Sequence, residues 1–272
     1  MQRKILLSFD VEEFDLPREY GVTISDDEMY EITTTGMNRV LGVLEQHGVC
    51  VTFFVTANYA LREGEMIKRM VAGGHEIASH GYDHGSFCDI DLQKSRDVLC
   101  EVSGQDVVGF RRARLVETNR EAIAAAGYTY NSSENPIWLP GRYNHFFGTR
   151  TAYLTGELLN VPISATPWLR VPLFWLGVKH FPMWLIKSAS ARVLRHDGYL
   201  NIFFHPWEFV DLSKYDLPRV ITRRMDHVML GRLSAYLRWL SGRGDFICMR
   251  DFDLFYRDKT VEEKEEVGDG VG

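Results

Sequence analysis

Short apolar runs alternate with segments of helical periodicity along most of the chain. The runs predict buried strands at 4–10, 50–56, 75–79, 107–111, 128–133, 158–164, 200–206 and 245–249. The segments between them predict helices at 31–47, 64–72, 91–103, 119–126 and 222–241. Strands that are apolar throughout and alternate with helices are typical of a parallel sheet covered on both faces. The number of such units predicts an α/β fold with the sheet curled into a barrel.

The domain organisation predicted from the sequence is simple. The chain has 272 residues, with no internal repeat and no Pro-rich or Gly/Ser-rich linker, so we expect a single catalytic domain over 1–257. The remaining stretch, 258–272, is acidic and lacks aromatic residues, which predicts a disordered tail.

Composition and charge narrow the classes of function. A net charge of -6 offers no basic surface for phosphate backbones, so a nucleic-acid partner is not expected. The first apolar run is interrupted by Asp10 and is too short for a signal peptide or a membrane span. The four cysteines form no CxxC pair, and we expect them to be reduced in a cytoplasmic protein.

Polar and ionisable residues follow the predicted strands at the point where each strand ends. In a parallel barrel all these ends lie on one face, which is where catalytic groups gather. The residues concerned are Asp10 and Glu12, His80 and His84, Arg111, Asn131 and Ser132, and His205. We therefore expect residues two hundred positions apart to share one pocket.

His80 and His84 are spaced as either a pair of metal ligands or two histidines in an ordinary polar loop. Two neutral imidazoles and one carboxylate would leave positions open for water on Zn²⁺ or a related divalent ion. Asp10 and Glu12 are both candidates for the carboxylate, because in an extended segment residues two apart point the same way. One of them could bind the metal while the other stays free as a base.

Five motifs in a fixed order resemble those of the polysaccharide deacetylase family, which has the NodB-homology domain and is also called carbohydrate esterase family 4. They are SFDVEEF, HEIASHGYDH, GFR, YNSS and FFHPWE, and the resemblance runs from about Lys4 to about Phe255. It implies a distorted (β/α)7–8 barrel with parallel strands. It also implies a metal-dependent hydrolase that removes N-acetyl groups from an amino sugar or polysaccharide, related to the cell envelope or to exopolysaccharide.

The resemblance also implies roles for individual residues. Asp10 matches the general base, Arg111 the arginine that orients it, and His205 the general acid, while His80 and His84 match the metal-binding histidines. The family usually has a second aspartate as the third ligand. Here Val11 occupies that position, and the DVE form resembles a subgroup in which the ligand is one residue later, at Glu12. The expected ion is Zn²⁺, with Ni²⁺ and Co²⁺ as alternatives.

Substrate contacts are expected from Trp207, Arg112 and Asn131. After Arg111 the family commonly has a Pro-containing segment, but this chain has Arg112, Ala113 and Arg114, which leaves room for an anionic substrate group. The aromatic stretch at 168–184 has three interpretations: a cover for the barrel, a wall on which a sugar stacks, or a surface that meets a membrane or a partner subunit. In the third, Phe174, Trp175 and Phe181 would contact a membrane carrying a lipid-linked sugar.

Two other functions compete with deacetylation. The same scaffold also hosts hydrolases of other C–N bonds, such as allantoinase-like enzymes that work without a metal, and a catalytically inactive carbohydrate-binding relative is the third interpretation. The glycan, its length, the native metal and the oligomeric state stay open.

Overall fold

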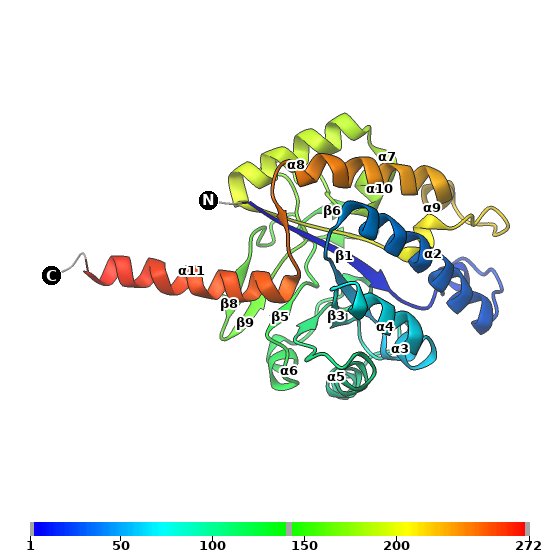
Figure 1. Ribbon diagram of the computed structural model, residues 1–272, viewed down its shortest axis with the longest axis horizontal. Coiled ribbons are helices and arrows are strands. Elements are labelled where there is room, and N and C mark those ends of the chain that lie inside the picture. Colours follow the sequence, from blue (N-terminus) through cyan, green and yellow to red (C-terminus); the bar gives the residue numbers. More distant parts are fainter. Residues whose placement is uncertain (1–2, 140–142, 270–272) are drawn as a thin grey trace.

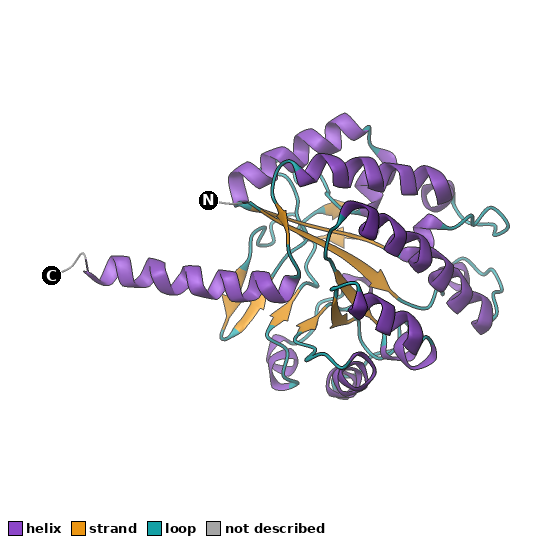
Figure 2. Ribbon diagram, viewed as in Figure 1, coloured by secondary structure: helices purple, strands orange, loops and turns teal. Residues whose placement is uncertain are grey.

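The computed structural model describes residues 3–139 and 143–269. Its centre is a mostly parallel sheet flanked by helices (Figures 1 and 2). The strands of this sheet in spatial order are β10 (Tyr199–Phe204), β1 (Lys4–Val11), β2 (Thr52–Val55), β3 (Glu76–Ser79), β4 (Gly109–Phe110), β5 (Tyr130–Asn131), β9 (Leu158–Asn160) and β8 (Tyr153–Thr155). The predicted α/β fold with a curled parallel sheet is confirmed.

Strand β1 lies inside the sheet, and the first candidate site residues lie at its end. It pairs with β10 from Lys4 to Phe9 on one side. On the other side it pairs first with β11 (Asp245–Phe246) and then with β2, from Ser8 onward. Apart from Lys4 every residue of β1 is buried, as its continuous apolar run predicts for a central strand.

The prediction that all strands are parallel is wrong in one region. β8 runs antiparallel to β9, and β6 (Trp138–Leu139) and β7 (Tyr143–Asn144) form a separate antiparallel pair. The β8–β9 connection is only Gly156 and Glu157, and a two-residue turn joins antiparallel strands whereas a parallel crossover needs a dozen residues or more. The glycine has φ +58, a backbone conformation that such a turn requires.

The sheet curls into a half-barrel without closing. The outermost strands, β10 and β8, are not paired in the described part of the chain. The gap is bridged after β9, where the backbone N–H of Ser164 donates to the carbonyl of Asn201 over 2.9 Å. The ends of the curled strands therefore still face one region, as the barrel prediction requires.

Helices cover the outside of the half-barrel. The longer ones are α2 (Asp26–His47), α4 (Gly64–Ala72), α5 (Ile90–Ser103), α8 (Met183–Asp197) and α10 (Asp226–Ser241). Shorter helical segments are α1 (Leu16–Glu19), α3 (Ala57–Arg62), η1 (Ala113–Leu115), α6 (Arg120–Ala125), α7 (Trp175–His180), η2 (Pro206–Phe209) and α9 (Arg219–Thr222). Helix α2 begins earlier than predicted because the side chain of Ser25 caps it by accepting from the N–H of Glu28.

The tail expected to be disordered from 258 is helical as far as Asp269. It continues α11 (Met249–Asp269), which projects away from the rest of the molecule in Figure 1. Glutamate and lysine are good helix formers, and Phe252, which is buried, anchors the first turns of this helix to the core. A helix already started in this way extends more readily than an isolated one forms.

The aromatic stretch at 168–184 is divided between the core and the surface. Phe174 and Trp175 are 1% and 3% exposed, and Phe174 stacks on Phe203 of β10 with 5.5 Å between ring centroids. These two residues cover the barrel, so their expected contact with a membrane is wrong. Trp168 and Trp184 are 86% and 71% exposed. No helix in the described ranges is long and apolar enough to cross a bilayer.

Candidate active site

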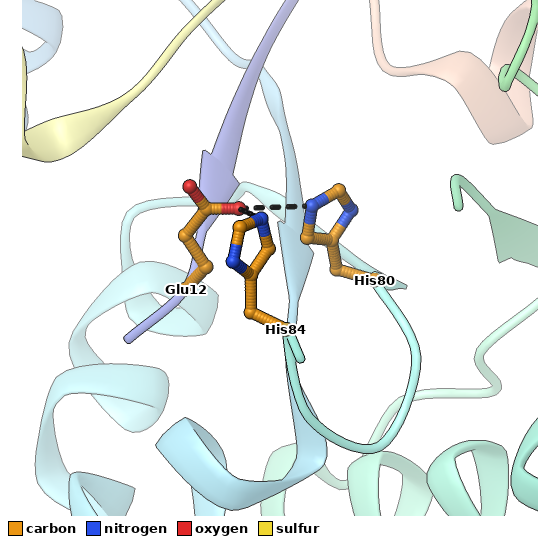
Figure 3. A group of neighbouring side chains, drawn as sticks. All are labelled: Glu12, His80 and His84. Atoms are coloured by element: carbon orange, nitrogen blue, oxygen red, sulfur yellow. Dashed lines mark hydrogen bonds and ion pairs between the residues drawn. The ribbon is translucent and has the colours of Figure 1, made fainter. Parts of the chain in front are cut away.

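Two strand ends bring the candidate metal ligands together. Glu12 directly follows β1, and His80 directly follows β3. Between His80 and His84 the chain turns at Gly81, which has φ +92 and whose carbonyl accepts from the N–H of Ala57. The turn brings both imidazoles beside the carboxylate of Glu12 (Figure 3).

The three side chains meet at one carboxylate oxygen. Oε2 of Glu12 lies 3.1 Å from Nε2 of His80 and 3.0 Å from Nε2 of His84. The candidate ligand atoms all lie within 4.8 Å of one another. The predicted convergence of one N-terminal acid and the histidine pair is therefore present in the fold.

The electrostatics of this cluster favour an ionised carboxylate. Burial alone would raise the pKa of Glu12, but the charge of His84 and hydrogen bonds from both histidines outweigh it and hold this pKa well below its usual range. For His84, burial opposes the charged form, while Glu12 and Asp15 together raise its pKa to about 10. A negative oxygen is thus held between two ring nitrogens.

Asp15 is a member of the site that the sequence interpretation missed. Its Oδ1 lies 2.7 Å from Nδ1 of His84. A carboxylate on one imidazole nitrogen fixes the ring orientation and leaves the other nitrogen for a metal, which is the usual arrangement of metal-binding histidines. The signal was a further acid, three residues after Glu12 in the same loop.

A divalent cation fits these donors. Two imidazole nitrogens and one buried carboxylate are a set that Zn²⁺ and related ions accept, with positions left for water or substrate. Nδ1 of His80 is buried and has no hydrogen-bond partner among the described residues, so only its Nε2 is engaged at the cluster. We therefore treat Glu12, His80 and His84 as a candidate metal centre.

Asp10 is held by a fully buried arginine. Nη1 of Arg111 lies 2.6 Å from Oδ1 of Asp10 and 2.9 Å from the hydroxyl of Ser8. The remaining guanidinium nitrogens donate to the carbonyl and the hydroxyl of Ser132, each over 3.0 Å, and Phe54 lies under the guanidinium plane at 4.0 Å. With every donor nitrogen occupied, Arg111 can hold the Asp10 carboxylate in only one orientation.

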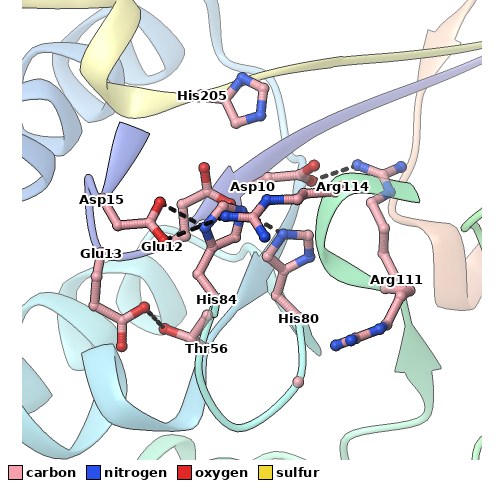
Figure 4. Close-up of polar contacts among 12 residues, drawn as sticks. Asp10, Glu12, Glu13, Asp15, Thr56, His80, His84, Arg111, Arg114 and His205 are labelled. Carbon is pink, nitrogen blue, oxygen red and sulfur yellow. Dashed lines mark hydrogen bonds and ion pairs between the residues drawn. The ribbon is translucent and has the colours of Figure 1, made fainter. Parts of the chain in front are cut away.

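His205 follows β10 and is oriented from the side away from the pocket. Its Nδ1 lies 3.2 Å from Oε1 of Glu208, and the same oxygen accepts from the His205 backbone N–H over 2.7 Å. The ring stacks on Trp207 at 4.9 Å and meets the edge of Trp175 at 5.4 Å. Glu208 thus fixes the imidazole and leaves Nε2 for a substrate. Figure 4 shows His205 together with Asp10, Glu12 and the histidine pair.

A narrow pocket of about 40 Å³ collects most of the predicted site residues. Among those that line it are Asp10, Glu12, His80, His84, His205 and Trp207. Arg111 lies behind Asp10 and reaches the pocket only through that carboxylate. The pocket is also lined by Arg114, whose Nη2 is paired with Glu19 at 2.6 Å.

Two expected substrate contacts lie elsewhere. The Arg112 guanidinium stacks over the ring of Phe87 at 3.7 Å and does not line the narrow pocket. Asn131 donates to Oδ1 of Asn160 and lines a second, larger cavity next to the pocket. The sequence placed both residues near a strand end, but it could not show which way their side chains turn.

Comparisons with known proteins find similarity to deacetylases. A sequence model described as polysaccharide deacetylase matches residues 15–130. A chitooligosaccharide deacetylase from Bradyrhizobium sp. (strain ANU 289) is 29% identical over 195 residues, covering 68% of this chain and 78% of that protein. The peptidoglycan-N-acetylmuramic acid deacetylase PdaA from Bacillus subtilis (strain 168) is 33% identical over 86 residues, which is 32% of either protein.

Solved structures show the same fold. A probable polysaccharide deacetylase from Pseudomonas aeruginosa PAO1 superposes with a TM-score of 0.66 at 17% identity, over 94% of this chain and 91% of that one. Puue allantoinase superposes with a TM-score of 0.63 at 16% identity, over 94% and 90%.

The fold and the Glu–His–His cluster at its strand ends define the class, a NodB-type (β/α) barrel with a candidate metal centre. The sequence match over residues 15–130, the motifs and this fold are similar to those of the polysaccharide deacetylase family.

Proposed function

We propose that this protein is a metal-dependent N-deacetylase that hydrolyses the acetamide of an amino sugar within a saccharide, and that it belongs to the DVE/HPWE-type subgroup of its family. The observation that carries the proposal is the convergence of Glu12, His80 and His84 beside Asp10 and His205 in one pocket. The similarity to a chitooligosaccharide deacetylase and to PdaA supports an N-acetylated saccharide as substrate.

Glu12, His80 and His84 would hold the divalent ion, most simply Zn²⁺ with Ni²⁺ or Co²⁺ as alternatives, and a bound ion of this kind polarises a carbonyl and acidifies water. Asp10 is the general base, because its carboxylate lines the pocket and its Oδ1 is held at 2.6 Å by Arg111. From this fixed position the carboxylate can take a proton from the attacking water.

His205 is the general acid. Collapse of the tetrahedral intermediate requires a proton on the departing amine, and an imidazolium donates one near neutral pH. Glu208 accepts from Nδ1–H and stabilises the charged ring, so Nε2–H is left to donate. Trp207, stacked on this ring, forms the pocket wall against which the acetyl group or sugar packs.

The setting of the reaction is proposed from the sequence and the relatives. We expect a substrate of the cell envelope or of an exopolysaccharide pathway, and a cytoplasmic enzyme acting on it. Contact with a lipid-linked sugar would involve the exposed Trp168 and Trp184 rather than the buried Phe174 and Trp175. Arg112 and Asn131 stay proposed substrate contacts, with Asn131 in the second cavity.

Metal analysis beside an acetate-release assay tests this function. Purified wild type should carry close to one equivalent of zinc, nickel or cobalt and release acetate from N-acetylated oligosaccharides. His80→Ala should lose most of the metal and the activity, because two of three ligands seldom retain an ion. His227→Ala is the matched control, since that side chain is 85% exposed and lies outside the pocket.

Chelation should abolish acetate release, and adding the metal back should restore it. Activity that persists in metal-free protein, or hydrolysis of a cyclic amide without acetate release, would instead support an allantoinase-like enzyme. Metal binding without hydrolysis of any N-acetyl sugar would favour an inactive saccharide-binding relative.

A further inference from the structure

Helix α8 has a basic outer face on the outside of the molecule (Figure 1). Its buried residues, among them Ile186 and Val193, face β10. The opposite face holds residues spaced by three, eight and eleven positions, which helical periodicity keeps on one side: Trp184, Lys187, Arg192 and Arg195. The only acidic residue of α8 is its last, Asp197, whose carboxylate pairs with Arg150. The outer face therefore combines an exposed indole ring with three positive charges.

The charge of this region is opposite to that of the whole chain. The chain has a net charge of -6, yet Glu157 is the only acidic residue between Glu134 and Asp197. The same stretch contains seven basic residues: Arg142, Arg150, Arg170, Lys179, Lys187, Arg192 and Arg195. Of these, the three on the outer face of α8 pair with no carboxylate among the described residues. An acidic molecule with one basic face turns that face toward a negatively charged surface.

A short loop over 165–172 exposes two large apolar side chains, those of Trp168 and Leu169. The backbone of Trp168 has φ 69 and that of Arg170 has φ 49, a region that residues other than glycine occupy at a cost. Such costly conformations persist where the surrounding structure enforces them, and they cluster at functional positions. The fold thus holds Trp168 and Leu169 in solvent instead of burying them.

The backbone donors of this loop are satisfied within the loop itself. The N–H of Leu169 donates to the carbonyl of Pro167 over 2.9 Å, and that of Arg170 to the carbonyl of Thr166 over 3.1 Å. The N–H of Val171 donates to the hydroxyl of Thr166 over 2.9 Å. Because these N–H groups need no water, the end of the loop can enter an apolar interface without leaving them unpaired.

The loop is attached beside α8. At its start, Nη1 of Arg150 donates to the carbonyl of Ala165 over 3.4 Å, and the same guanidinium pairs with Asp197 at the end of α8. At its end, the carbonyl oxygen of Pro172 lies so close to α7 that a Cβ atom on Gly177 would be 2.3 Å from it. Helix α7 in turn packs on α8. The apolar loop and the basic helix therefore belong to one continuous part of the surface.

We propose that this part of the surface docks on an anionic lipid bilayer. The docking face consists of Trp168 and Leu169 of the loop and Trp184, Lys187, Arg192 and Arg195 of α8. Indole rings favour the boundary between lipid headgroups and acyl chains, and basic side chains are attracted to anionic headgroups. The apolar and the electrostatic contributions together give peripheral binding without a membrane span. This inference goes beyond the proposed function, since it concerns where the protein works and not what it hydrolyses.

A second copy of the chain fits the docking face less well. The commonest pairing of two identical chains is two-fold symmetric, and it places the same patch of both copies face to face. The unpaired Lys187, Arg192 and Arg195 would then meet the same three cations of the other copy. Like charges brought together in this way oppose association, whereas an anionic bilayer attracts them.

Co-sedimentation with lipid vesicles tests the docking. Wild type should bind vesicles of phosphatidylcholine and phosphatidylglycerol mixed in equal amounts, and binding should fall at least about tenfold on pure phosphatidylcholine. The double variant Arg192→Gln, Arg195→Gln should lower the partition coefficient on the mixed vesicles about tenfold or more and should weaken its dependence on salt. Trp168→Ser with Leu169→Ser should lower it about tenfold through the lost apolar contact.

Matched controls make the same chemical changes elsewhere. Leu61→Ser removes an exposed apolar side chain of α3. Lys68→Gln with Lys94→Gln removes two exposed positive charges from α4 and α5, which pack on β3 whereas α8 packs on β10. Both controls should bind the mixed vesicles like wild type. Wild type that stays in the supernatant, or equal losses in the control and docking-face variants, would overturn the proposal.

Two further measurements separate the alternatives. A dimer in solution that the Trp168→Ser, Leu169→Ser variant dissociates, without vesicle binding by wild type, would assign the face to a second copy and overturn the membrane proposal. Both docking-face variants should release acetate from a water-soluble N-acetylated oligosaccharide at the wild-type rate, and His80→Ala should still bind the mixed vesicles. If wild type binds these vesicles but releases no acetate from any probe, the deacetylase proposal fails and the docking stands.

Discussion

Lys179 is a buried cation near His205, the proposed general acid. It is 0% exposed, and its Nζ donates to the carbonyl of Ile221 over 2.8 Å. The ammonium lies 5.2 Å from the ring centroid of Trp175 and 5.5 Å from that of Trp207, the two rings that contact His205. Burial lowers the pKa of Lys179 to about 8, against the opposing charge of Glu208. Lys179 is therefore a positioning residue that connects the rings of Trp175 and Trp207 to α9.

Replacing Lys179 with methionine should keep the volume and remove the charge. We expect kcat for acetate release to fall about tenfold while metal content stays at the wild-type level. The reason is that Trp175 and Trp207 lose a cation–π interaction of about 1–2 kcal/mol.

Lys68→Met, at a side chain that is 66% exposed, is the control and should change neither quantity. A Lys179→Met enzyme that loses metal together with kcat would indicate a purely structural role for the lysine.

At the scale of elements, the contact between α2 and η2 sets the position of His205. Gly36 of α2 faces η2 so closely that a Cβ atom there would lie 2.0 Å from the carbonyl oxygen of Pro206. Pro206 directly follows His205, so a shift of Pro206 would also shift His205. Any side chain at Gly36 must move either helix α2 or the segment that carries His205, the proposed general acid.

Gly36→Ala should destabilise the protein by about 1–3 kcal/mol, as overpacked core positions do, and should also lower kcat/KM. Gly42→Ala in the same helix is the matched control. A Cβ there meets nothing within 4 Å, so it should raise stability by about 0.5–1 kcal/mol and leave activity unchanged. Urea unfolding and acetate release measure both effects, and equal stability of the two variants would contradict the packing argument.

At the scale of the whole molecule, we keep residues 1–257 as a proposed single catalytic domain whose stability depends on buried groups far from the site. His75 is 5% exposed, and its Nδ1 accepts from the N–H of Val51 across the β2–β3 edge over 3.3 Å. Burial lowers the pKa of His75 from 6.5 to about 4. The unfolded chain therefore binds a proton at a pH where the folded chain does not.

The stability contributed by neutral His75 should be fully present above pH 6.5 and should be lost as the pH falls toward 4, by up to about 3 kcal/mol. His75→Asn keeps an acceptor for Val51 without titrating, so its free energy of unfolding should change less over this range. Urea unfolding at several pH values measures the difference. His227→Asn should retain the wild-type slope, and parallel curves for wild type and His75→Asn would refute the assignment.

The sequence by itself determined where most strands lie and which residues follow them. Continuous apolar runs mark buried strands whatever the rest of the chain does, and the polar residues after them, such as Glu12, His80 and His205, must then meet at one end of a parallel sheet. The motifs and their order indicated the family resemblance in the same way, because each motif consists of residues that are neighbours in the sequence.

Only the tertiary structure decided which groups touch. Three features depend on how segments far apart in the sequence pack together, which the hydrophobic period of one segment does not encode. They are the pairing of Asp15 with His84, the burial of Lys179 and Trp175, and the contact of Arg112 with Phe87. The antiparallel β8 and the cavity around Asn135 likewise depend on how short loops pack. A hydrophobic pattern reports which face of an element is buried, whereas distances between loops are set by long-range packing of the whole chain.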